Sequence, residues 1–181
     1  RSLEKPVYKE KLRLRAYGTP TDSSPVFLEI KKKYDGVVYK RRVSTDFAQA
    51  MRFLTEGIPP ESGDYVARQV TAEMTHMIRR DGLIPRAAVF YDRRAFHGAD
   101  DPELRLTLDG NIRYRLGDLD LRNGTDGDTI PGQPFRIMEI KSASSIPLWL
   151  AGTLSELGIH PGSFSKYGSV YKQRFQDLCA T

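Results

Sequence analysis

The sequence predicts an α+β fold in which antiparallel strands pair through short hairpins and helices flank the sheets. Apolar and polar side chains alternate with a period of two in several segments, and two segments of helical period follow the first strands. The strand–helix–strand alternation of parallel sheets is absent from the pattern. Because 181 residues suffice for one domain with a sizeable core, we expect a single domain over residues 1–181.

The first half of the chain is predicted to form three strands and then two helices. The Asp35-Gly36 pair has the signature of a hairpin turn between the second and third strands. Ser44-Thr45-Asp46 caps the first helix, which ends at Gly57, and Gly82 ends the second. The strands cover residues 11–17, 26–33 and 37–43, the helices cover 47–54 and 62–80, and Val66, Val70, Met74 and Met77 are predicted core residues.

The second half is predicted to return to strands and to end in helices. A Gly110-Asn111 turn is expected to separate two of these strands. Three glycines and a proline indicate a flexible loop over residues 123–133. The strands cover residues 83–95, 104–110, 112–116, 118–122 and 134–142, an amphipathic helix covers 147–157, and a last helix runs from about 163 to 178.

Four of the predicted strands place charged side chains on one face and apolar side chains on the other. A row of like charges repels itself unless an anion lies over it. If the apolar faces pack against helices, the charged faces surround a water-filled lumen, which about eight antiparallel strands can enclose. Periodicity leaves the opposite arrangement open, with the charges in solvent. The charged sets are Lys11, Arg13 and Arg15; Glu29 and Lys31; Arg105 and Asp109; and Glu139 and Lys141.

The composition of the chain limits the classes of molecule that it is expected to bind. A net charge of +5 and a pI near 9.3 favour an anionic partner, and arginines favour phosphate in particular. Carboxylates among the basic residues fit a hard divalent cation that is shared with phosphates. Aromatic residues are not interleaved with the basic rows, which argues against nucleic acid. No apolar run approaches a membrane span, so we expect a cytoplasmic protein whose membrane tether, if any, comes from another segment or partner. The oligomeric state is left open.

Six segments, in order, resemble the VTC domain. This is the polyphosphate polymerase domain of the vacuolar transporter chaperone complex and its bacterial relatives, in the triphosphate tunnel metalloenzyme (CYTH-like) superfamily. The resemblance implies an antiparallel β-tunnel that binds ATP, triphosphate or polyphosphate with Mn²⁺ or Mg²⁺. The segments are Lys11–Gly18, Val26–Lys31, Tyr91–Phe96, Leu104–Asp109, Met138–Lys141 and Ser163–Tyr167.

The resemblance also implies the site residues. Glu139 matches the metal-binding glutamate of the family. From the alternation of the strands we add Lys141 to the predicted catalytic residues and Glu29 as a second candidate metal ligand. The positions that match the phosphate-contacting basic residues of the family, which would position and neutralise the reacting phosphates, are Arg13, Arg15, Lys31, Arg93, Arg105 and Lys166.

The chain departs from the family pattern in two places. The first tunnel strand is expected N-terminal to Arg1, and without it the barrel cannot close within this chain. Ser163 stands where some members carry a lysine. The resemblance implies a polymerase that transfers the γ-phosphate of ATP to a growing polyphosphate chain. A hydrolase of tripolyphosphate or polyphosphate and a non-catalytic polyphosphate-binding module are the alternatives.

Overall fold

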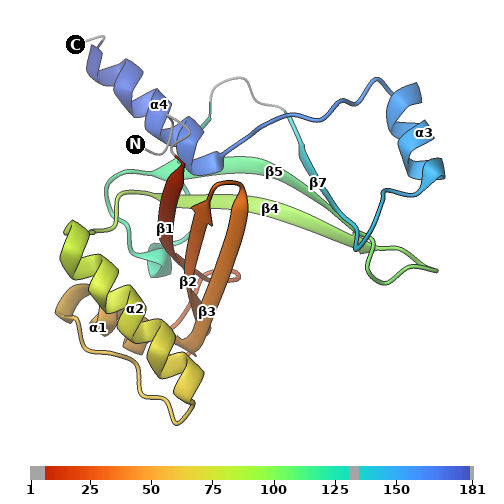
Figure 1. Ribbon diagram of the computed structural model, residues 1–181. Helices are drawn as coiled ribbons and strands as arrows, with labels where there is room; N and C mark the ends of the chain where they lie inside the picture. The colour runs from red at the N-terminus through yellow and green to blue at the C-terminus, as the bar shows by residue number, and fades with distance from the viewer. Residues whose placement is uncertain (1–6, 131–134, 180–181) are drawn as a thin grey trace. The chain divides into compact units, whose positions relative to one another are not determined.

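The computed structural model describes residues 7–130 and 135–179, with side chains described up to residue 173 (Figure 1). The chain forms two compact units, Arg1–Arg86 with Asp118–Thr125, and Ala87–Gly117 with Asp126–Thr181. Each unit has an antiparallel sheet of its own. The α+β class with antiparallel sheets is therefore confirmed, and the described residues form no closed barrel. That residues 1–181 fold as a single domain stays a prediction.

The first unit contains a three-stranded antiparallel sheet. Its order is β1 (Tyr8–Arg15), β2 (Pro25–Tyr34) and β3 (Val37–Asp46). Asp35 and Gly36 both have positive φ, 41° and 83°, as the tight turn between twisted strands requires. The predicted hairpin is confirmed.

Two helices, α1 (Phe47–Glu56) and α2 (Tyr65–Asp81), cover one face of this sheet (Figure 1). The Asp46 carboxylate accepts a hydrogen bond from the Gln49 backbone N–H at 2.7 Å, which confirms the predicted cap. The cap of α2 is Asp64, so this helix begins later than predicted. Each large side chain buried in this core contributes roughly 1.5–3 kcal/mol.

The core of the first unit confirms most of the predicted core residues. Val66 is the exception, because it lies in the first turn of α2 and is exposed. Leu12 and Leu14 of β1 pack against the core, so Arg13, which lies between them, points to the opposite face. The buried residues are Val26, Leu28, Ile30, Val43, Phe47, Ala50, Phe53, Val70, Met74 and Met77.

The second unit is built around the long strand β5 (Arg105–Arg115). It pairs antiparallel with β4 (Ala88–His97) along one edge, and with β6 (Asp128–Thr129) and β7 (Ile137–Lys141) along the other. Two helices follow, α3 (Leu148–Glu156) and α4 (Lys166–Cys179). The second core contains Ile112, Tyr114, Ile130 and Val170.

The predicted Gly110-Asn111 turn is wrong, because these residues form a β-bulge inside β5. Phe90 pairs with Arg113 and Asp92 pairs with Gly110, so Tyr91 alone faces Asn111 and Ile112. Asn111 takes the left-handed conformation, with φ of 49°. The extra residue reverses the alternation of β5. Asp109 before the bulge and Ile112 after it therefore point to the same face.

Other boundaries also differ from the predictions. The strand expected from residue 83 begins at Ala88, because Pro85 offers no backbone donor to a ladder. The strand expected over 118–122 is wrong, since a 3₁₀ turn, Leu121–Asn123, lies there in the first unit. The loop expected over 123–133 contains β6 and the buried Ile130, and residues 131–134 lie outside the described residues.

The helix predicted over residues 147–157 is confirmed as α3, but its apolar side chains are not collected on a buried face. Leu148 is 90% exposed and Trp149 is also exposed, whereas Leu150 is buried. The amphipathic character was therefore predicted wrongly.

Candidate functional site

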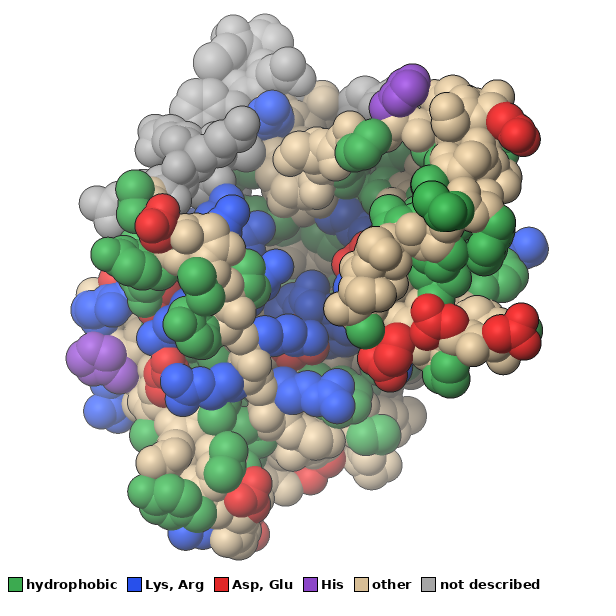
Figure 2. Space-filling model, turned by 45° about the vertical axis from the view of Figure 1, so that its right-hand side comes forward, with side chains coloured by type: hydrophobic (Ala, Val, Ile, Leu, Met, Phe, Trp, Pro, Cys, Tyr) green, Lys and Arg blue, Asp and Glu red, His purple; other side chains and the backbone are tan. Residues whose placement is uncertain are grey.

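The face of the three-stranded sheet opposite the helices is strongly cationic, and we call it the first basic face. Its eight cations and one carboxylate give a larger positive excess than the net charge of +5 of the whole chain. The positive charge of the protein is therefore concentrated here. On the face drawn in Figure 2, Lys and Arg side chains gather densely with few carboxylates among them. The first basic face consists of Lys9, Lys11, Arg13, Arg15, Glu29, Lys31, Lys33, Lys40 and Arg42.

Glu29 is the centre of the first basic face. It lies in the middle strand and is 2% exposed. Arg13 Nε donates to its Oε2 at 2.5 Å, Arg15 Nη2 lies 3.7 Å from the same oxygen, and Lys40 Nζ lies 3.1 Å from Oε1. Burial acts to raise the pKa of Glu29, but hydrogen bonds from Lys40 and Arg13, together with the charges of Arg13 and Arg15, outweigh burial and lower the pKa. Glu29 is therefore an ionised counter-ion inside a cationic surface.

The sheet of the second unit has its own charged face, which we call the second basic face. On β5, Arg105 is directly opposite Lys141 of β7, and Asp109 is directly opposite Arg93 of β4. Directly paired residues point to the same side of a sheet, so predicted site residues from three strands share this face. It consists of Arg93, Arg105, Asp109, Glu139, Lys141 and Lys166.

Asp109 organises the second basic face and is 2% exposed. Arg93 donates through Nε and Nη2 to the two carboxylate oxygens at 2.6 and 2.8 Å, and Lys166 Nζ donates to Oδ2 at 2.6 Å. Burial acts to raise the pKa of Asp109, and the hydrogen bonds from Arg93 and Lys166 outweigh it and lower the pKa. The pKa of Arg93 is raised by its hydrogen bonds to Asp109. A fixed guanidinium and a fixed ammonium thus lie side by side.

Lys166, the first residue of helix α4, contacts Asp109 on the second basic face. The β-bulge turns Ile112 and Tyr114 to the same face as Asp109, and Val170 of α4 packs on them. Lys166 lies one helical turn before Val170 and reaches both Asp109 and the ring of Tyr91, whose centroid is 4.3 Å from Nζ. The packing of Val170 on Ile112 and Tyr114 therefore holds α4 in the position from which Lys166 contacts Asp109.

Glu139 is the predicted metal ligand with an accessible carboxylate. Its side chain is 49% exposed, with Lys141 Nζ at 3.3 Å and Arg93 Nη2 at 4.0 Å. The described residues hold no group of three acidic, His or Cys side chains arranged for a metal ion. Mg²⁺ is often held by one or two carboxylates together with substrate phosphates, so Glu139 fits that mode of binding. Glu29 fits it less well, because an ion would have to displace the cations around it.

The structure brings the predicted site residues together in two groups. Arg13, Arg15, Lys31 and Glu29 share the first basic face, and the other predicted residues share the second. That these residues bind phosphate and metal stays a prediction. Sequence reasoning noted Asp109 as a charged strand residue but missed its central place. The missing signal was its cross-strand pairing with Arg93, which a single strand does not reveal.

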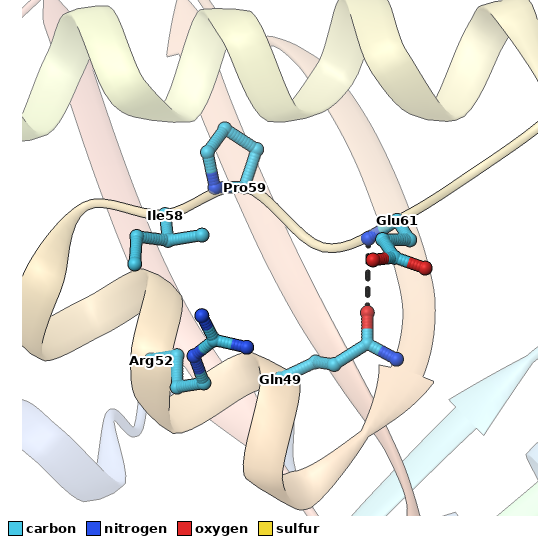
Figure 3. A pocket seen from close by; sticks show the side chains of 5 residues that line it. All are labelled: Gln49, Arg52, Ile58, Pro59 and Glu61. Atoms are coloured by element: carbon cyan, nitrogen blue, oxygen red, sulfur yellow. Dashed lines mark hydrogen bonds between the residues drawn. The ribbon is translucent and has the colours of Figure 1, made fainter.

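Two cavities lie elsewhere in the first unit and contain none of the predicted site residues. One, of about 250 Å³, lies between α1 and the segment after it (Figure 3). In it the Glu61 backbone N–H donates to Gln49 Oε1 at 2.9 Å, and Arg52 is the cation in the lining. The other, of about 300 Å³, involves Lys32 and Arg41, which both pair with Glu73. The linings of these two cavities contain one and two cations, fewer than either basic face.

Two antiparallel sheets, each with a cation-rich face around one buried carboxylate, define an α+β protein suited to bind polyanions. The family model of the VTC domain matches residues 1–175, so the chain belongs to the VTC domain family. Membership indicates a polyphosphate-related function. A search of curated proteins finds no match to the chain. None of the helices in the described part of the chain is long and apolar enough to cross a membrane.

Proposed function

We propose that the chain is a polyphosphate polymerase domain, which transfers the γ-phosphate of ATP to a growing polyphosphate chain in a basic tunnel. Membership of the VTC domain family over residues 1–175 carries this proposal. The two basic faces support it, because they combine arginines that bind phosphate oxygens bidentately with lysines that act as point charges.

In the proposed reaction an ionised oxygen of the terminal chain phosphate attacks the γ-phosphorus of ATP in line. The bond from that phosphorus to the bridging oxygen breaks, and ADP leaves with the electron pair. No general base is needed, because the attacking oxygen is already ionised. Arg93, held by Asp109, and Lys166 would neutralise charge that develops on the transferring group.

Glu139 would hold Mn²⁺ or Mg²⁺ together with phosphate oxygens. The ion would supply charge neutralisation at the phosphates. Lys141, 3.3 Å from Glu139, would bind the same phosphates from the neighbouring position on β7. Arg105 lies opposite Lys141 and is exposed, so both can contact one ligand.

The test is a Glu139→Gln variant of the full-length protein. Size and hydrogen bonding are kept, while the charge that anchors a divalent ion is lost. We expect Mn²⁺-dependent conversion of ATP to polyphosphate to be abolished, while metal-free polyphosphate binding survives or tightens. Glu103→Gln, the same change in an exposed loop, is the matched control and should leave synthesis unchanged.

The products distinguish the alternatives. A polymerase yields ADP and long chains, whereas a hydrolase releases orthophosphate from tripolyphosphate. Full synthesis by the Glu139→Gln variant would remove Glu139 from the mechanism. Wild-type protein that binds polyphosphate and carries out neither reaction would be a binding module.

A further inference from the structure

Three exposed aromatic residues gather where helix α4 begins, beside Lys166. Phe164 is 44% exposed, Tyr167 is 38% exposed and Tyr171 is 43% exposed. The ring of Phe164 packs on the ring of Phe135 in a T-shaped contact, with centroids 5.5 Å apart and planes at 67°. Such a contact uses the edge of one ring and one face of the other. At least one face of the Phe164 ring is therefore left uncovered by Phe135.

Phe164 lies at the apolar end of the second basic face. Its partner Phe135 packs against the core that contains Ile112, and Ile112 points to the same face as Asp109. Tyr167 directly follows Lys166, through which α4 contacts the sheet, so it is turned about 100° away around the helix. Phe164 is therefore the exposed ring that packs on this face.

The charged side chains follow in order from this apolar end. Asp109 comes first, Glu139 follows on the neighbouring strand, and Arg105 lies opposite Lys141 at the far end. Asp109 and Arg105 are four residues, or about 13 Å, apart along β5. A linear polyphosphate is charged along its whole length and has no group that suits an apolar end. A nucleotide has both a charged triphosphate and a flat, largely apolar base, so it matches a face that is divided in this way.

We propose that the nucleobase of ATP stacks on Phe164, so that ATP lies along β5 with its base at the α4 end and its γ-phosphate toward Arg105 and Lys141. This inference rests on the proposed function and deepens it. It names a residue that distinguishes ATP from phosphates without a base, and it sets the direction in which ATP lies. The growing chain then meets the γ-phosphate from the Arg105 end, opposite the leaving ADP, as an in-line reaction requires.

The selectivity that stacking gives is for the presence of a base and not for its identity. A ring contacts the flat face of a base and does not read its hydrogen-bonding edge. ATP and GTP should therefore depend on Phe164 alike, whereas tripolyphosphate, which lacks a base, should not depend on it. The stacking of one base on an aromatic side chain is strong enough to change affinity by about tenfold or more.

The experiment measures the affinity of the full-length protein for ATP, GTP and tripolyphosphate by titration calorimetry without divalent metal, so that no turnover occurs. We expect Phe164→Ala to weaken the binding of both nucleotides by about tenfold and that of tripolyphosphate by less than about twofold. Phe164→Trp keeps a stacking ring and should retain the affinity for nucleotides. Phe96→Ala is the matched control and should change none of these affinities, because Phe96 is 50% exposed and lies, with Leu106, on the opposite face of the same sheet.

Steady-state kinetics give a second measurement. Phe164→Ala should raise the KM for ATP in Mn²⁺-dependent synthesis by a similar factor and change kcat much less, because the base is stacked equally in the bound state and the transition state. Equal weakening of ATP and tripolyphosphate would show that Phe164 acts only by supporting the cations, and no weakening of either would show that the base does not stack there. Both results would overturn the inference and leave the proposed function intact. Wild-type protein that binds neither ATP nor tripolyphosphate would overturn the proposed function and, with it, this inference.

Discussion

Neutralising Asp109 should destabilise the second unit, because this carboxylate is the shared acceptor of two cations. Asp109→Asn keeps the shape of the side chain but replaces one accepting oxygen with an amide that donates. Arg93 then loses part of its paired contact at 2.6 and 2.8 Å, and the ion pair from Lys166 at 2.6 Å is lost. The two cations also remain close together without a counter-charge.

The magnitude follows from burial. A hydrogen bond to a charged group contributes about 1.5–3 kcal/mol, and breaking a fully buried ion pair costs about 3–5 kcal/mol. Asp109 is almost fully buried, but the side chains of Arg93 and Lys166 are 33% and 22% exposed, so water recovers part of the loss. We expect a loss of about 2–3 kcal/mol. Asp92→Asn, on an exposed carboxylate of the same strand pair, should cost at most about 1 kcal/mol.

The assay is amide hydrogen exchange of β5, which reports the local free energy of unfolding. Because folding lowers the pKa of Asp109, its stabilising effect is present above the ordinary pKa of an aspartate and is lost as pH falls through the lowered value. The difference between wild type and Asp109→Asn should therefore shrink from pH 7 to about pH 3. A difference that does not change with pH, or an Asn variant as stable as wild type at pH 7, would refute this account of the cluster.

Two further predictions concern binding and packing. Arg105→Ala should weaken tripolyphosphate binding by about 1.5–3 kcal/mol in titration calorimetry. Thermal stability should change little, because Arg105 makes no ion pair among the described residues. Unchanged affinity would show that Arg105 does not contact tripolyphosphate. Gly127→Ala should lower the thermal unfolding temperature, because its new methyl group would overlap the backbone carbonyl of Tyr114. Gly117→Ala is the control, because no other atom lies within 4 Å of a methyl group added at Gly117. Equal unfolding temperatures for the two variants would contradict the packing described for Gly127.

The first unit was predictable because its signals are local. Alternation in β1 and β2 separates Leu12 and Leu14 from Arg13, and Asp35-Gly36 specifies the hairpin without help from the rest of the chain. The basic residues of this face therefore followed from the sequence. That Lys11, Lys31 and Lys40 lie directly opposite one another on three strands could not be predicted, because the register between strands is a property of their pairing.

The second unit was less predictable because its determinants are not local. Gly110 and Asn111 are residue types typical of turns. The bulge becomes evident only when β5 is paired with β4, because one residue of β4 then faces two residues of β5. The two residues of β6 pair within a segment rich in glycine, where no alternation can be read. The central place of Asp109 depends on Arg93 in β4 and Lys166 in α4, which lie 16 and 57 residues from it in the chain.

The bulge at Gly110 and Asn111 makes the length of β5 as important as its composition. Substitutions along this strand affect one contact at a time, whereas deleting the extra residue would restore strict alternation and exchange the two sides beyond that point. Ile112 and Tyr114 would leave the face on which Val170 packs, and α4 would lose the surface that places Lys166. Among changes found in variant libraries or related sequences, single-residue insertions and deletions here are therefore the ones that would separate the helix from the charged cluster.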